Sequence, residues 1–322
     1  MTSITTRLQH RVDQRPSSAV DVNASAPARR VLAIGAVLAA GTLAIAVVGL
    51  VVDPRLIGGE PAWVKPAKFG VSITLFLVAL RWILASVHAH RRLLTGIAVV
   101  LVVAFGLETL WVDGQVLRGT TSHFNAATAF DAAAFNAAGG VVSLLLVGTA
   151  WVGVLALRTR GLDAGVEAGI RWGLAVTVLG MLEAVSMLVN GFTATSMGAH
   201  TVGAPDGGPG MALTGWSLAH GDLRIAHFLG LHALQGLPLL AWLLQRRTAL
   251  GQRVRRDLLR VAGTGWALLV VLLWWQAERG QALLQPDPLT LVAASVLAVL
   301  LAVAAGAVLR GGRRAELASA PA

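Results

Sequence analysis

The chain has 322 residues, of which 56% are hydrophobic and 13% charged, and its mean hydropathy is +0.71. A soluble domain carries about 25% charged residues, so this composition excludes a water-soluble globular protein and predicts an integral membrane protein. The absence of cysteine excludes disulfides and thiolate metal sites. The net charge of +10 does not indicate nucleic-acid binding, because the arginines lie in short clusters between apolar runs.

Apolar runs of similar length dominate the chain after residue 30. Residues 1–30 are polar and show no apolar periodicity, so we expect a disordered cytoplasmic tail there. Crossing the roughly 30 Å hydrocarbon core of a bilayer takes about 20 apolar residues. That length predicts an all-α bundle of eight transmembrane helices over residues 31–310 and a short cytoplasmic tail at 311–322. The predicted spans are residues 31–52, 68–88, 93–113, 138–157, 170–190, 225–245, 261–277 and 288–309.

The positions of arginine and lysine predict how the bundle is oriented. With the N-terminus inside, the cytoplasmic segments hold 19 of the 26 basic residues and the outer segments hold six. The positive-inside rule predicts this asymmetry for eight helices with both termini in the cytoplasm. We therefore expect a multi-pass protein of the bacterial inner (cytoplasmic) membrane, with the lipid bilayer as its partner. The long outer segment 191–223 is rich in glycine and proline, which is typical of a lid, a binding loop or disorder.

Carboxylates and imidazoles in the outer half of the bundle are the candidates for chemistry. Such groups cost free energy at membrane depth unless a partner holds them. Two helices each bring a glutamate to the outer half, and a third brings two histidines that point about 140° apart. Carboxylate and imidazole are the usual ligands of iron, zinc or manganese. We predict a metal site from His123, His227, His232, Glu108 and Glu183, with Glu108, Glu183 and His232 as the catalytic residues.

Each of these groups has a purely structural alternative. The glutamates would form ion pairs with Arg118 or Arg224, and the histidines would donate hydrogen bonds to helix carbonyls.

Both lysines of the chain lie in one short stretch, WVKPAKFGVS at residues 63–72. Pro66 suits the first turn of a helix, which places Lys65, Lys68 and Ser72 on one face. Two ammonium groups at a helix N-terminus predict an anion site for a phosphate, a carboxylate or a propionate. We include Arg118 and Arg224 among the binding residues; the alternative for the lysines is contact with lipid headgroups.

Two resemblances accompany these motifs. The strings KP-x-K-F-x-x-S at 65–72 and S-H-F-N at 122–125 resemble an uncharacterised bacterial multi-pass membrane protein family, which implies no activity. The layout of eight spans with both termini inside and outward histidines resembles haem A synthase. That family pairs histidines from helices of both halves, whereas the fourth and eighth spans here contain none, so no residue is carried over.

Three classes of function follow from these patterns. The first is a membrane-embedded metal- or haem-dependent oxidoreductase with an outward-facing histidine and glutamate site. The second is a proton-coupled transporter in which Glu108 and Glu183 titrate. The third is a non-catalytic assembly factor or sensor. The residues identify no cofactor, for which a metal ion or a haem is the candidate, and they leave open whether the protein is an enzyme. The expected ligand is a small anionic or lipophilic molecule that arrives from the outer side.

Overall fold

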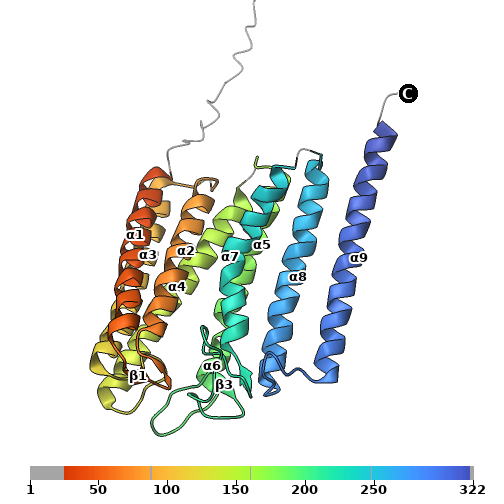
Figure 1. Cartoon of the computed structure of the whole chain (residues 1–322). Coiled ribbons are helices and arrows are strands. Elements are labelled where there is room, and N and C mark those ends of the chain that lie inside the picture. Colours follow the sequence, from red (N-terminus) through yellow and green to blue (C-terminus); the bar gives the residue numbers. More distant parts are fainter. Residues whose placement is uncertain (1–24, 88, 160, 248, 320–322) are drawn as a thin grey trace, which may run out of the picture.

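The structure, a computed structural model, describes residues 25–319 except residues 88, 160 and 248. Long helices form nearly all of it (Figure 1). The short helix α6 (Val185–Val189) continues α5 after a break at Ala184. The long helices are α1 (Ala26–Val52), α2 (Val64–Leu84), α3 (Arg91–Arg118), α4 (Ala129–Arg158), α5 (Ala164–Glu183), α7 (Arg224–Gln245), α8 (Gln252–Glu278) and α9 (Pro288–Ser319).

Eight helical segments of the described residues are long and apolar enough to cross a membrane, with α5 and α6 together forming the fifth. The prediction of an all-α, eight-helix, multi-pass membrane protein is therefore confirmed. Large apolar side chains such as Val37 and Val51 are 71% and 83% exposed, as suits helices solvated by lipid. Helix α1 includes residues 26–30 of the predicted N-terminal tail, and α9 continues through Ser319 of the predicted C-terminal tail. The rest of both predicted tails, residues 1–24 and 320–322, lies outside the described residues.

The helices form two groups of four that follow the chain order. Helices α1 to α4 make the N-terminal half, and α5, α7, α8 and α9 make the C-terminal half (Figure 1). The halves meet where α4 packs on α5 and where α2 packs on α7. We call this junction the seam. Helix α9 lies at the edge of the row, against α8.

Helices α5 and α7 pack closely against each other within the C-terminal half, beside the seam. A Cβ atom added to Gly180 would lie 2.7 Å from the Cα atom of Gly230, so the two backbones touch. The Thr177 hydroxyl donates to the Gly230 carbonyl at 3.4 Å. Small residues commonly allow such close approach between membrane helices. The contact places the first turns of α7 directly beside the last turns of α5.

Two hairpins shape the end of the bundle that carries the longest loop, which we call the loop end. Strands β1 (Leu56–Ile57) and β2 (Glu60–Pro61) pair antiparallel, with Ile57 opposite Glu60. Strands β3 (Thr201–Val202) and β4 (Gly221–Asp222) also pair antiparallel, with Thr201 opposite Asp222. The chain between β3 and β4 folds back over the bundle. The predicted loop 191–223 is thus an ordered cap.

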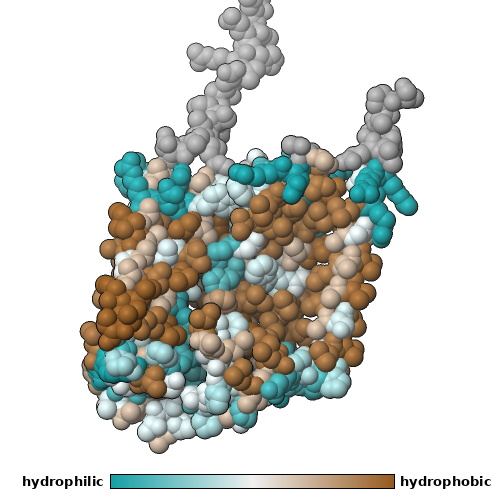
Figure 2. Space-filling view, in the orientation of Figure 1, coloured by the Kyte–Doolittle hydropathy of each residue, from teal (hydrophilic) through white to brown (hydrophobic). Residues whose placement is uncertain are grey.

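The opposite end, which we call the terminal end, carries the starts of α1 and α3 and the end of α9 (Figure 1). Figure 2 shows a broad hydrophobic belt between two hydrophilic ends, with hydrophilic surface also at mid-height between the two halves. The belt is what a membrane protein presents to lipid. The arginine distribution predicts that the loop end faces the outer side.

Candidate functional site

One lysine, one glutamate and three histidines, which come from both halves of the bundle, lie near one another at the loop end of the seam. Lys65 comes from the first turn of α2, Glu108 from α3 and His123 from the connection between α3 and α4. His200 directly precedes β3, and His227 lies in the first turn of α7. Their charges act on one another: Lys65, His200 and His227 all act on His123, and Glu108 acts on Lys65. We call these five residues the polar cluster.

Four charged side chains beside the polar cluster form a network that joins the two halves. Lys68 Nζ lies 3.0 Å from Glu60 Oε2, and Arg224 Nη1 lies 3.5 Å from Glu60 Oε1. Arg224 also donates from Nε and Nη2 to the two carboxylate oxygens of Asp222, at 2.9 and 2.7 Å. Glu60 and Lys68 belong to the N-terminal half, whereas Asp222 and Arg224 belong to the C-terminal half. We call Glu60, Lys68, Asp222 and Arg224 the lid clamp.

The lid clamp also holds the loop at residues 203–217, the lid loop, against the bundle. Lys68 Nζ donates to the Thr214 carbonyl at 3.0 Å, and Arg224 Nη2 donates to the Gly215 carbonyl at 2.6 Å. Gly215 has φ +64°, and a Cβ atom there would lie 1.7 Å from Glu60 Oε1. Glycine at this position therefore lets the loop backbone press directly on the Glu60 carboxylate.

Lys65 differs from the other cations near it. Lys68 and Arg224 each have a carboxylate partner, but the half-buried Lys65 ammonium forms no hydrogen bond and no ion pair within the described part of the chain. Glu108 is 3% exposed, and its carboxyl group likewise has no hydrogen-bond partner among the described residues. A positive group and a buried carboxyl group thus lie close together without direct contact.

The loop histidines have lowered pKa values. Burial lowers the pKa of His123 well below its usual value, and the charges of Lys65, His200 and His227 lower it further. Burial also lowers the pKa of His200, although Asp206 opposes this effect. His200 Nδ1 lies 2.8 Å from Asp206 Oδ1. Burial would raise the pKa of Asp206, but His200 and the backbone N–H of Thr201 outweigh it and lower the pKa to about 2.

The two histidines of α7 meet different neighbours, as their predicted angular separation requires. His227 Nδ1 lies 2.8 Å from the Gly180 carbonyl of α5, so Nδ1 carries the hydrogen and Nε2 is the free nitrogen. His232 lies deeper, with its ring 4.1 Å from that of Phe228 and its Nδ1 3.3 Å from the Gln235 side-chain amide. His227 therefore belongs to the polar cluster and His232 does not.

Glu183 forms a separate feature at the break between α5 and α6. It is 1% exposed, and neither carboxylate oxygen has a hydrogen-bond partner among the described residues. The Ser186 hydroxyl donates instead to the Glu183 backbone carbonyl at 2.8 Å. The charges that act on Glu183 are those of Glu278 and Asp222, which are of the same sign. Glu183 is thus isolated from the cations of the polar cluster.

Arg118 lies apart from the predicted binding residues. Its Nη1 donates to Asp131 Oδ1 at 2.7 Å and to Gln115 Oε1 at 2.6 Å, and its guanidinium group lies over the Phe130 ring. Asp131 also accepts a hydrogen bond from the Thr128 hydroxyl, so this group fixes the start of α4. Lys65, Lys68 and Arg224 do come together, as the predicted anion site requires.

The side chains predicted as metal ligands do not converge. Within the described ranges, no three histidine, aspartate or glutamate side chains are arranged to hold a metal ion. His232 lies deeper along α7, and the charges that act on Glu183 are those of other carboxylates. His123, His227 and Glu108 share the polar cluster but do not form a three-ligand group.

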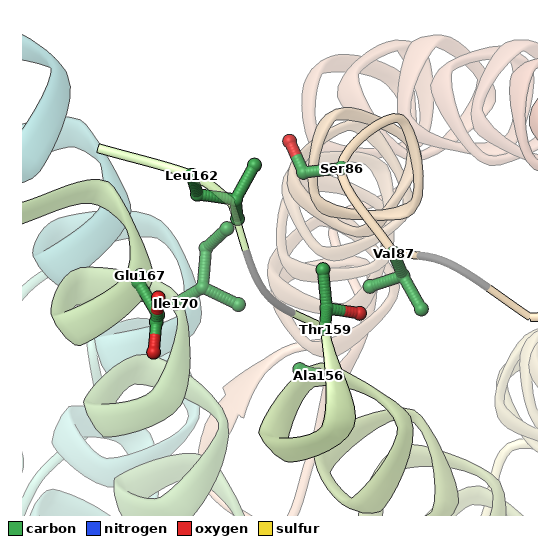
Figure 3. Close-up of a pocket in the computed structure, with 7 residues that line it drawn as sticks. All are labelled: Ser86, Val87, Ala156, Thr159, Leu162, Glu167 and Ile170. Carbon is green, nitrogen blue, oxygen red and sulfur yellow. The ribbon is translucent and has the colours of Figure 1, made fainter. Parts of the chain in front are cut away.

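The terminal end of the seam is apolar by comparison. Figure 3 shows a small hollow there, lined by residues of α4 and α5, of the connection between them and of the connection that follows α2. Its one charged lining residue, Glu167, forms an ion pair with Arg171 on the next turn of α5. The lining residues are Ser86, Val87, Ala156, Thr159, Leu162, Glu167 and Ile170.

Sequence reasoning missed two parts of the site. It did not single out Glu60, which partners Lys68, and it did not pair His200 with Asp206. The sequence does contain a signal for Glu60, which is the Gly58-Gly59 pair directly before it. In the structure both glycines have positive φ and turn the chain back towards the start of α2. His200 and Asp206 lie only six residues apart in one polar loop.

Comparison with known proteins adds no assignment. No model of a protein family matches the sequence, and no curated protein and no solved structure is detectably similar to it.

Proposed function

We propose that this membrane protein binds a small anionic ligand from the outer side, at the loop end of the seam and beneath the lid loop. The observation that carries the proposal is Lys65, a half-buried ammonium group that forms no ion pair with any described residue, although Glu108 lies near it. A cation held at the edge of a membrane without a direct ion pair is unfavourable unless something compensates it. A ligand carboxylate or phosphate group supplies that compensation.

The surroundings of Lys65 support an anion rather than a neutral ligand. Lys68 and Arg224 contribute further positive charge, although Glu60 and Asp222 neutralise part of it. His123 adds an imidazole N–H group that can donate to an anion, whereas the free Nε2 of His227 accepts a hydrogen bond from a hydroxyl or amino group of the ligand. Glu108 would accept a hydrogen bond from a hydroxyl or amino group of the same ligand. The site therefore fits a small organic acid that also carries a donor group.

Calorimetric titration of the purified protein in mild detergent tests this proposal. The probes are acetate, lactate, glycine and inorganic phosphate, which vary the anion and the additional donor. We expect at least one to bind stoichiometrically, and we expect Lys65→Gln to weaken that binding at least tenfold. Arg279→Gln is the matched control, because Arg279 lies at the same end and pairs with Asp287 away from the cluster. Equal binding by Lys65→Gln, or no binding of any probe by the wild-type protein, would contradict the proposal.

A transporter is the second candidate, and Glu183 is the observation that favours it. A buried carboxyl group without a hydrogen-bond partner among the described residues is a candidate to take up and release a proton during transport. Its position at a break between two helices of one span is also typical of transporter sites. Uptake of the bound probe into proteoliposomes under an imposed pH gradient tests this function. Glu183→Gln should remove the effect of the gradient while leaving detergent-phase binding intact.

A further inference from the structure

A second feature, unrelated to the polar cluster, is a groove of about 570 Å³ at the terminal end of the bundle. It runs between the first turn of α1 and the first three turns of α3. A volume of this size is typical of small-molecule and lipid sites. Its lining residues are Pro27, Arg91, Arg92, Thr95, Gly96, Val99 and Val100.

One end of the groove is positively charged. Arg91 and Arg92 are exposed, and neither forms an ion pair within the described part of the chain. Arg30 is also exposed and lies three residues after Pro27, on the same face of α1. The first turn of α3 contains no acidic residue, so the positive end of its dipole adds to the charge of the arginines.

The other end of the groove is apolar and open. Val99 and Val100 are 43% and 41% exposed, and Val99 lies roughly 12 Å along the helix axis from Arg91 at 1.5 Å per residue. Over that distance a membrane changes from headgroups to hydrocarbon. Gly96 lies between the two ends, and a Cβ atom there would have no other heavy atom within 4 Å. The missing side chain therefore keeps the groove open.

We propose that this groove binds an anionic phospholipid. Its phosphate contacts Arg91 and Arg92, and the first part of one acyl chain lies across Gly96 against Val99 and Val100. Arginine binds phosphate through paired, charge-assisted hydrogen bonds, and anionic lipids are attracted to basic groups at the membrane surface. A free phosphate ion would leave the apolar wall unused. A zwitterionic lipid would leave the charge of the arginines unbalanced.

Thermal unfolding of the full-length protein in mild detergent, with added lipid, tests this site. The probes are dioleoylphosphatidylglycerol and dioleoylphosphatidylcholine, which share acyl chains and differ in net charge. We expect the anionic lipid to raise the Tm of the wild-type protein by several degrees more than the zwitterionic lipid. Arg91→Gln/Arg92→Gln and Gly96→Leu should each lose at least half of that difference, the first by removing charge and the second by filling the groove.

Two matched control variants distinguish binding in the groove from a general attraction of anionic lipid to basic residues. Arg313→Gln/Arg314→Gln removes the same charge from α9 at the same end of the bundle, and Gly106→Leu adds the same side chain where α3 is equally open. Both controls should keep the wild-type difference between the lipids. The proposal is overturned if the two lipids act equally on the wild-type protein, if the controls lose as much as the groove variants, or if inorganic phosphate reproduces the effect.

Discussion

The two ends of the seam lie between the same two halves of the bundle but differ in the side chains that they bring together. At the loop end, charged groups from both halves make direct contacts, and Asp222 is 1% exposed within its pair with Arg224. At the terminal end, apolar side chains such as Val87 and Ile170 line a small hollow, and its one charged residue, Glu167, pairs with Arg171 on its own helix. The charged residue at the terminal hollow pairs within one helix, whereas charged residues at the loop end join the two halves of the bundle.

Removing a carboxylate at each end gives the largest contrast. Asp222→Ala takes away four accepted hydrogen bonds, from the backbone N–H groups of Ser217 and Arg224 and from the Arg224 guanidinium. We expect a loss of about 3 kcal/mol, because the half-buried Arg224 loses its main partner. Asp257→Ala breaks exposed pairs with Arg256 and Arg260 and should cost less than about 1 kcal/mol. Chemical denaturation in detergent measures both, and equal losses would remove the distinction between the two ends.

Displacing the Glu60 carboxylate should release the lid loop. In Gly215→Ala, the new methyl group would occupy the position of Glu60 Oε1, and alanine at φ +64° is strained by about 1–2 kcal/mol. The carboxylate must move, and its contacts with Lys68 and Arg224 then weaken. We expect proteinase K to cleave the lid loop at least tenfold faster.

Gly208→Ala is the control for that experiment. Gly208 lies in the same loop, and a Cβ atom there meets no neighbouring atom within 4 Å. Its cleavage rate should stay within about twofold of the wild-type rate, because it touches neither Glu60 nor Arg224. Similar acceleration in both variants would show that the clamp does not hold the loop.

Acid should weaken the loop end through its histidines. Burial lowers the pKa of His200 and of His123 in the folded protein, so the unfolded chain binds protons more readily near pH 6.5. Stability is therefore fully present above that pH and is lost as the pH falls towards the folded pKa values, by at most about 1.4 kcal/mol per pH unit for each histidine. His200→Gln should show a shallower fall in Tm between pH 6.5 and 5, whereas the exposed His90→Gln should not.

Asp206 does not contribute in that pH range. Its pKa is lowered to about 2, so its favourable interactions persist until the pH falls below the ordinary aspartate value near 3.8. If His200→Gln loses as much stability between pH 6.5 and 5 as the wild-type protein does, the loss arises from groups other than His200.

The sequence predicted the eight spans and placed Lys65 and Lys68 on one face of a helix, because apolar length and helical spacing are local properties. It could not predict which groups pair. Glu60 reaches Lys68 through a tight hairpin, and His227 reaches Gly180 only because α5 and α7 touch. Such contacts depend on packing between distant segments. The predicted metal site has the same weakness. Its ligands were predicted from their depth in the membrane, which does not show which side chains are neighbours.

The smallest expected effect concerns the metal content of the purified protein. Because no three described histidine or carboxylate side chains converge, we expect no stoichiometric zinc or manganese held by three such side chains in the purified protein. His227→Ala/His232→Ala should leave the elemental analysis unchanged, since His227 is hydrogen-bonded to Gly180 and His232 lies against Phe228. One metal ion per chain in the wild-type protein, absent from the double variant, would contradict this expectation. The polar cluster would then adjoin a metal site that includes a histidine of α7.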